Sequence, residues 1–176
     1  MATRGIRPIR IEGNVAYVPL TQGYEAVIDA ADVTLVDGFN WFAHVFRRRD
    51  RSIRAIYAER RGPHSGGQTT IIMHRVIDAT PSGMETDHID GDGLNNRRSN
   101  LRAATKAQNQ HNAKTRVDNK SGAKGVHWDK RNRKWRVQIA VMAKNKHIGL
   151  FTTFADAQEA YAKAIAATRG EFGRLS

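Results

Sequence analysis

Residues 87–109 constrain the fold of this chain more than any other part of the sequence. Residues 84–89 have the composition of a strand, and an Asp-His pair stands near its end. A loop rich in Gly and Asn follows, and then Thr105 and Gln108 have the T-x-x-Q spacing of a capping box, which begins a helix. The sequence therefore predicts a strand and a helix that are joined by a long polar loop.

This stretch carries the group types of a metal site. Asp87 supplies a hard oxygen ligand and His88 a titratable nitrogen, which together can hold a divalent cation and activate water for attack on a phosphodiester. Asn109, in the first turns of the predicted helix, offers a second oxygen, and so sparse a site suits Mg²⁺. Adjacent residues on a regular strand point to opposite faces, so we expect an irregular strand end at Ile89.

Residues 87–102 read DHIDGDGLNNRRSNLR and, with Asn109, closely resemble the HNH endonuclease motif in its phage and intron-homing form. The resemblance implies a ββα-metal fold with His88 as the general base that deprotonates the attacking water. It implies Asp87 and Asn109 as metal ligands, and Asn100 as the residue that orients the base and braces the loop. In this branch Asn replaces the final His of the motif, so Asn109 is the expected ligand.

The implied reaction is in-line hydrolysis with one Mg²⁺ per site, for which Mn²⁺ can substitute, giving 5′-phosphate and 3′-hydroxyl ends. His111 is the rival of Asn109 as a ligand, but two residues apart on a helix they face about 200° away from each other. His74 is either a packed or capping histidine or a neighbour of His88.

Three arginines in or after the loop have two interpretations. They either clamp phosphates next to the cleaved one or belong to an exposed loop that is merely basic. These arginines are Arg97, Arg98 and Arg102.

The net charge of +12 and the pI of about 10.6 favour a polyanionic partner, and double-stranded DNA is the one we expect. There is no Cys, which excludes disulfides and Cys-ligated zinc. No apolar run approaches the length of a membrane span or a signal segment. We therefore expect a cytoplasmic protein with no membrane partner. The resemblance to the phage form of the HNH motif implies a phage or its bacterial host as the source, and we expect a monomer.

Residues 1–73 predict a small β-rich region without identifiable chemistry. Residues 1–10 read as a frayed basic arm, and Asp29 is expected to cap a short helical turn. The run of arginines at residues 47–51 is either a solvated hairpin tip or a DNA contact. Trp41 is expected in the core.

Residues 74–112 form the expected nuclease core, 113–123 a linker, and 124–176 a basic module of three strands and one helix. Spacings such as SG.KGV.W and KW.V.I, over about residues 121–172, resemble the ethylene-response-factor (APETALA/ERF) DNA-binding domain. By this resemblance Trp135 points inward. The DNA-facing positions are Lys124, His127, Arg136, Gln138 and His147.

The fold class that these elements predict is α+β throughout. The function they indicate is a metal-dependent DNA endonuclease, delivered to DNA by its basic C-terminal module. The alternative is a non-catalytic, sequence-specific DNA-binding protein or regulator derived from such a nuclease.

Overall fold

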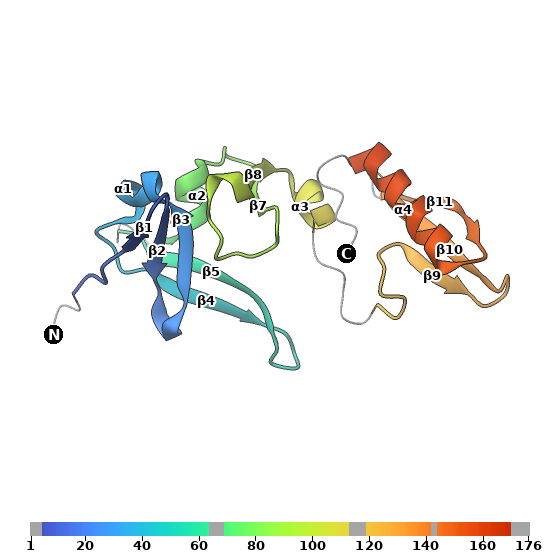
Figure 1. Ribbon diagram of the computed structural model, residues 1–176, viewed down its shortest axis with the longest axis horizontal. Helices are drawn as coiled ribbons and strands as arrows, with labels where there is room; N and C mark the ends of the chain where they lie inside the picture. Colours follow the sequence, from blue (N-terminus) through green and yellow to red (C-terminus); the bar gives the residue numbers. More distant parts are fainter. Residues whose placement is uncertain (1–4, 64–68, 113–118, 142–143, 170–176) are drawn as a thin grey trace. The chain divides into compact units, whose positions relative to one another are not determined.

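The computed structural model describes residues 5–63, 69–112, 119–141 and 144–169 (Figure 1). The chain forms two compact units, Met1–Lys106 and Ala107–Ser176, whose positions relative to one another are not determined. Strands and helices are mixed in both, so the predicted α+β class is confirmed. The division falls inside the segment 74–112, and the domain boundaries drawn from the sequence stay a prediction.

The first unit begins with an antiparallel sheet in the order β1-β2-β3, made of β1 (Arg10–Glu12), β2 (Val15–Pro19) and β3 (Glu25–Asp29). Burial alternates along β2 and β3, so one face of this sheet belongs to the core. Two 3-10 turns, Thr21–Gly23 and Ala30–Asp32, follow β2 and β3, and the short helix α1 (Val33–Val36) follows the second turn.

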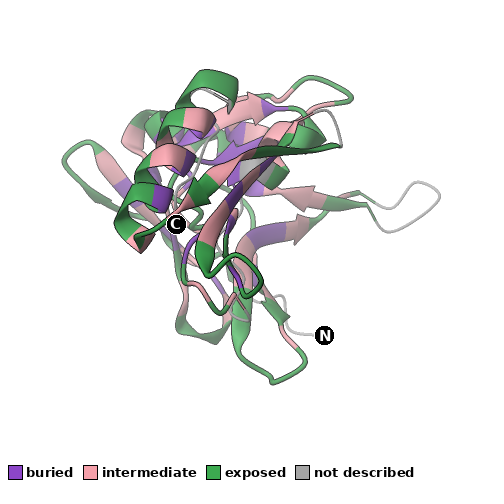
Figure 2. Cartoon of the chain, turned by 90° about the vertical axis from the view of Figure 1, so that its right-hand side faces the viewer, coloured by how far each residue is buried: buried purple, intermediate pink, exposed green. Residues whose placement is uncertain are grey.

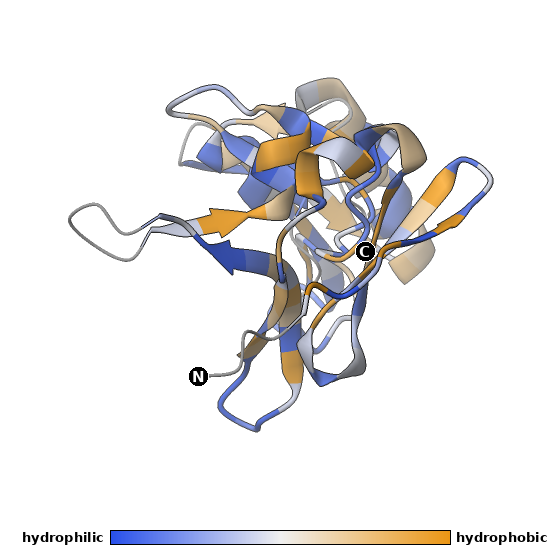
Figure 3. Ribbon diagram, turned by 90° about the vertical axis from the view of Figure 1, so that its left-hand side faces the viewer, coloured by the Kyte–Doolittle hydropathy of each residue, from blue (hydrophilic) through white to orange (hydrophobic). Residues whose placement is uncertain are grey.

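A second antiparallel sheet has the order β4-β5-β6, with β4 (Phe42–Arg47), β5 (Ile53–Arg61) and β6 (Thr70–Ile72). Trp41, the residue before β4, is fully buried, as predicted. Its indole N–H donates to the carbonyl of Val36 at 2.8 Å. The core joins both sheets. In Figure 3 apolar (orange) and hydrophilic (blue) segments both occur on the strands, and the loops are mostly hydrophilic or neutral in colour.

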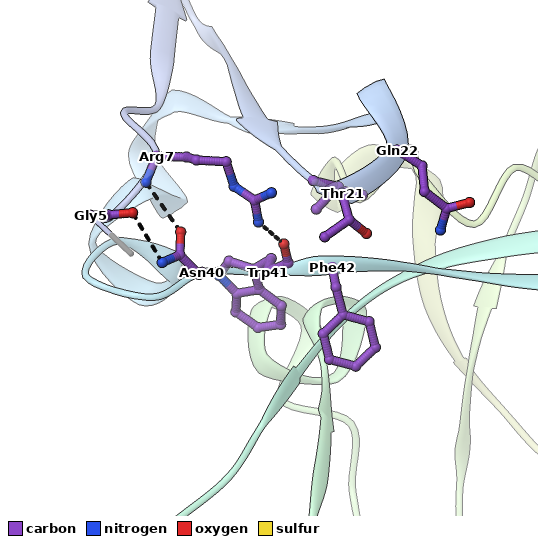
Figure 4. A pocket seen from close by; sticks show the side chains of 8 residues that line it. Gly5, Arg7, Thr21, Gln22, Asn40, Trp41 and Phe42 are labelled. Atoms are coloured by element: carbon purple, nitrogen blue, oxygen red, sulfur yellow. Dashed lines mark hydrogen bonds between the residues drawn. The ribbon is translucent and has the colours of Figure 1, made fainter. Parts of the chain in front are cut away.

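Residues 5–9 are tied to the fold, so the expected frayed arm is wrong for this part of residues 1–10. The backbone N–H of Arg7 donates to Oδ1 of Asn40 at 3.2 Å, and Nδ2 of Asn40 donates to the carbonyl of Gly5 at 3.2 Å (Figure 4). The guanidinium of Arg7 also donates to the carbonyl of Trp41. These residues border a cavity of about 570 Å³, which Leu20, Thr21, Gln22 and Phe42 also line.

The motif occupies a two-stranded antiparallel sheet, β7 (Glu85–His88) and β8 (Leu101–Ala104), next to helix α2 (Met73–Asp78). A long loop joins the two strands and ends in the 3-10 turn Arg98–Asn100. The loop lies against β3, because the N–H of Val27 donates to the carbonyl of Leu94 at 2.8 Å and the carbonyl of Val27 accepts the N–H of Asn96 at 2.7 Å. The N-terminal sheet therefore supports the motif loop.

Helix α3 (Lys106–Asn112) begins where the T-x-x-Q spacing predicted a helix, at the division between the units. The second unit is an antiparallel sheet in the order β11-β10-β9, covered by helix α4 (Phe154–Arg169). The strands are β9 (Val126–Asp129), β10 (Lys134–Val141) and β11 (Lys144–Phe151), and this arrangement confirms the predicted three strands and helix.

The core of the second unit lies between one sheet face and α4. Val137 and Ile139 of β10 are buried against Tyr161 and Ile165 of α4, whereas the outward side of that helix is exposed (Figure 2). Thr153 caps the helix, since its Oγ1 accepts the N–H of Asp156 at 3.1 Å.

Candidate active site

His88 is the last residue of β7 and is only 6% exposed. Its Nε2 is 3.1 Å from Oδ1 of Asn96, whose Nδ2 donates to the carbonyl of Leu94 at 3.1 Å. Because the amide nitrogen of Asn96 already donates, its oxygen accepts, and Nε2 of His88 carries the hydrogen. In the neutral ring Nδ1 is then the basic nitrogen.

Burial of this ring favours its neutral form. Burial lowers the pKa of His88 below its ordinary value, and the hydrogen bond with Asn96 and the charges of Asp90, Asp87 and Asp92 oppose that shift without cancelling it. A neutral histidine ring whose Nε2 carries the hydrogen is able to accept a proton at Nδ1.

The strand ends as the sequence predicted. β7 stops at His88 and the chain turns at Ile89 and Asp90, with the N–H of Ile89 donating to the carbonyl of Asn100 at 2.9 Å. Asp87 lies directly opposite Arg102 in the β7–β8 register, whereas His88 lies opposite Leu101. Successive residues of a strand point to opposite faces, so Asp87 and His88 meet different partners.

Asp87 is 4% exposed and forms an ion pair with Arg102. Nε of Arg102 donates to Oδ2 of Asp87 at 2.9 Å, and a terminal guanidinium nitrogen lies 2.8 Å from the same oxygen. The carboxylate that was predicted as a metal ligand is thus held in place by its cross-strand arginine.

Asn100 braces the loop. Its Nδ2 donates to Oδ1 of Asp90 at 2.9 Å and to the carbonyl of Asn95 at 2.8 Å, and its Oδ1 accepts the N–H of Asp90 at 3.0 Å. The predicted orientation of the base by Asn100 stays a prediction. Asn96, to which no role was assigned from the sequence, provides a hydrogen bond to the ring of His88.

Asp90 is a second residue that sequence reasoning missed. Burial raises its pKa, but hydrogen bonds from the N–H of Asp92 and from the side chains of Asn100 and Asn95 outweigh burial, so the pKa of Asp90 is lowered overall. Its negative charge acts on His88, and it is a further oxygen donor of the loop. Its signal in the sequence was weak, because Asp in an Asn- and Gly-rich loop is common.

His74, left open by the sequence, lies against His88 with ring centroids 5.0 Å apart, and Tyr57 lies 5.6 and 6.0 Å from the two rings. Burial first, and then the charges of His88 and Arg75, lower the pKa of His74 to about 3. Its Nδ1 is buried without a hydrogen-bond partner among the described residues. Two neutral histidines therefore share one buried corner of the site.

The loop closes over Tyr57 only because residue 93 is glycine. A Cβ on Gly93 would lie 2.3 Å from the carbonyl oxygen of Ile56 and 2.6 Å from the ring of Tyr57. This close approach brings the loop onto β5 beside the histidines.

The three arginines predicted as phosphate clamps are each paired with a carboxylate. Arg97 lies 2.8 Å from Asp29 and Arg98 2.7 Å from Asp32, and Arg102 pairs with Asp87. The expected cap is also corrected here, since the carboxylate of Asp29 forms no cap bond and instead accepts from Arg97 and from the N–H of Arg98. Contact of these arginines with DNA stays a prediction.

Asn109 lies on α3, partly buried, with interactions of its own. Because the two units are not placed relative to one another, its role beside Asp87 stays a prediction. The side chain of His111 lies outside the described residues. Within the described ranges, no group of three or more His, Asp or Glu side chains is arranged to hold a metal ion.

Four of the five predicted DNA-facing residues of the second unit share one sheet face. Arg136 lies opposite His127 in the register and Gln138 lies opposite His147. Directly paired residues point to the same face, and here it is the face away from Val137, Ile139 and α4. Arg136 is ion-paired with Asp129, and Lys124 precedes β9.

Comparison with known proteins supports the motif. Residues 79–111 match the family described as HNH endonuclease, and this range includes His88, Asp87, Asn100 and Asn109. A 64-residue stretch, 36% of this chain, is 42% identical to Protein 3.8 of Escherichia phage T7. The chain spans about half, 53%, of that phage protein. No solved structure matches. Residues 79–111 are thus similar to the HNH endonuclease family.

No helix in the described part of the chain is long and apolar enough to cross a membrane.

Proposed function

We propose that this protein is a metal-dependent endonuclease of double-stranded DNA in which His88 is the general base. The observation that carries the proposal is the buried His88, which Asn96 holds at the end of β7 inside the HNH segment and whose pKa is lowered by burial. A base of this kind needs a fixed nitrogen and an ordinary or lowered pKa, so that it is unprotonated before the reaction.

The residues present fit a hard divalent cation. Asp87 and Asp90 supply carboxylate oxygens, and Oδ1 of Asn95 is buried without a hydrogen-bond partner among the described residues, an oxygen suited to a cation or water. We propose that Asp87, together with Asn109, would hold Mg²⁺. When bound, this ion supplies stabilisation of the charge on the phosphate and on the leaving 3′ oxygen.

The remaining steps belong to the protein. Asn96 keeps the hydrogen on Nε2 of His88, so Nδ1 takes the proton of the water that attacks the phosphorus in line. Asn100 holds the loop that carries Asp90 in its conformation. The products are a 5′-phosphate and a 3′-hydroxyl.

The second unit supports delivery to DNA. We propose that it is an ethylene-response-factor type module that places its uncovered sheet face, with Arg136 and Gln138 at the centre, against duplex DNA. Residues 113–176 contain 14 Lys and Arg against 5 Asp and Glu, so binding should weaken steeply with salt.

The alternative is a non-catalytic DNA-binding protein descended from a nuclease. The ion pair between Arg102 and Asp87 favours it, because that pair already engages the predicted ligand. Plasmid nicking in Mg²⁺ or Mn²⁺ against EDTA, for wild type and His88→Ala, separates the two proposals.

The expected result is metal-dependent nicking that falls by about 10²- to 10⁴-fold in His88→Ala. The variant should bind duplex DNA in EDTA as wild type does, which controls for folding. Absence of nicking by the wild type, or nicking that survives the substitution undiminished, would overturn the proposal.

A further inference from the structure

The β4–β5 hairpin has an ordered, basic tip. The N–H of Arg48 donates to the carbonyl of Ser52 at 2.8 Å, and its guanidinium donates to the carbonyl of Ile53 at 2.9 Å. Arg51 adopts a left-handed conformation with φ of 66°, which closes the turn. Hydrogen bonds thus fix the path of the backbone at the tip.

The positive charge of this hairpin is not neutralised within it. Residues 42–61 contain seven arginines against one Asp and one Glu. Asp50 is held by the N–H and hydroxyl of Ser52, and Glu59 is bound by Nδ1 of His44 at 2.9 Å, so both carboxylates are engaged by other groups.

Five arginines at the far end of the hairpin form no ion pair with a carboxylate of the described residues, and four of them are exposed. They are Arg47, Arg48, Arg49, Arg51 and Arg54. The arginines of the motif loop differ, because each of them pairs with Asp29, Asp32 or Asp87. The arginines of the hairpin end thus differ from those of the loop in having no carboxylate partner among the described residues.

One face of the hairpin leads from His88 toward this tip. Tyr57 lies beside His88, Phe46 meets the edge of Tyr57 at 5.8 Å between centroids, and His44 stacks on Phe46 at 4.1 Å. His44 and Tyr57 are directly paired, so these rings share one face. Phe46 is 40% exposed. Ring contacts thus link His88 to the face of the hairpin that carries Phe46.

We propose that the β4–β5 hairpin is a DNA-binding arm that contacts the phosphate backbone of the duplex on one side of the cleaved phosphate. A two-stranded ribbon fits the width of the major groove and can lie along a backbone. From Tyr57 to Ile53, where β5 begins, four residue steps of strand span about 14 Å at about 3.4 Å per residue. At about 3.4 Å of helix axis per base pair, this part of the arm spans about four base pairs.

This inference rests on the proposed function for the position of the cleaved phosphate, and the test is chosen to separate the two. The full-length double variant Arg49→Gln/Arg54→Gln is compared with the charge-matched Arg10→Gln/Lys163→Gln. Arg10 and Lys163 are exposed, lie outside the hairpin and are ion-paired with glutamates. All variants should unfold at the temperature of the wild type.

The assay is fluorescence anisotropy with a 30-base-pair duplex in EDTA over a series of salt concentrations. Loss of two phosphate contacts should reduce the slope of log K against log salt by about 1.8 in the hairpin variant. The control variant should keep the slope of the wild type. An equal slope in the two double variants would overturn the assignment of the arm.

Cleavage in Mg²⁺ is measured in parallel. If the wild type does not cleave and the slope is reduced in the hairpin variant, the nuclease proposal is overturned and the proposal of the arm is supported. Cleavage by the wild type with an unchanged slope in the hairpin variant would support the nuclease proposal and overturn the proposal of the arm.

Discussion

Replacing Asn96 with Ala removes the hydrogen-bond partner of the buried His88 ring. Asn96 is 1% exposed, and its amide joins Nε2 of His88, at 3.1 Å, to the carbonyl of Leu94, also at 3.1 Å. When Nδ1 takes the proton, the ring becomes charged, and a hydrogen bond to a charged group contributes about 1.5–3 kcal/mol. The loss corresponds to a cleavage rate about 10- to 150-fold lower.

The assay is single-turnover cleavage in Mg²⁺ over a range of pH, with Asn14→Ala, at an exposed turn, as the control. The bond with Asn96 raises the pKa of His88, so its removal lowers that pKa further. The acid limb of the pH–rate profile should therefore move to lower pH, which a purely structural defect would not cause. A rate within about two-fold of wild type and an unmoved limb would refute the role of Asn96.

Two further predictions concern stability. Gly93→Ala should destabilise the protein by about 1–3 kcal/mol in thermal unfolding, because its Cβ would overlap the carbonyl of Ile56 and the ring of Tyr57. The control Gly5→Ala, whose Cβ would have nothing within 4 Å, should leave the unfolding temperature unchanged. An equal shift of the unfolding temperature in the two variants would contradict the packing argument. The pKa of His74 is about 3 in the folded state against 6.5 in the unfolded state, so the unfolded state binds the proton first as the pH drops. The free energy of unfolding should therefore fall between pH 6.5 and pH 3, by up to about 1.4 kcal/mol per pH unit. Chemical unfolding of His74→Phe should show a smaller fall, and a pH dependence identical to that of the wild type would exclude His74 as its source.

Local patterns predicted the parts of the site that are close in sequence. The strand with Asp87 and His88, the loop and the start of α3 follow from turn chemistry and a capping box. The bracing role of Asn100 came from the family resemblance, and the hydrogen bonds of its side chain agree with that role.

The contacts missed by the sequence join residues far apart in the chain. Arg97 and Asp29 are 68 residues apart, so neither the pairing nor the loss of the expected cap at Asp29 has a local signal. His74 and His88 come together because α2 packs against β7 and β8, and a lone His gives no indication of this. For the same reason nothing in the sequence indicated that Arg97 and Arg98 of the loop are ion-paired, with Asp29 and Asp32 respectively.

The contact of the motif loop with β3 limits which segments of the chain recombination can transfer with the motif intact. A segment that begins at residue 74 would lose Val27, Asp29 and Asp32, and with them the backbone bonds of Leu94 and Asn96 and the partners of two arginines. Recombination that transfers the motif between proteins would therefore keep it intact only when the crossover lies before β3. The part of the chain that keeps the motif loop in place therefore includes β3 and the turn after it, as well as the motif itself.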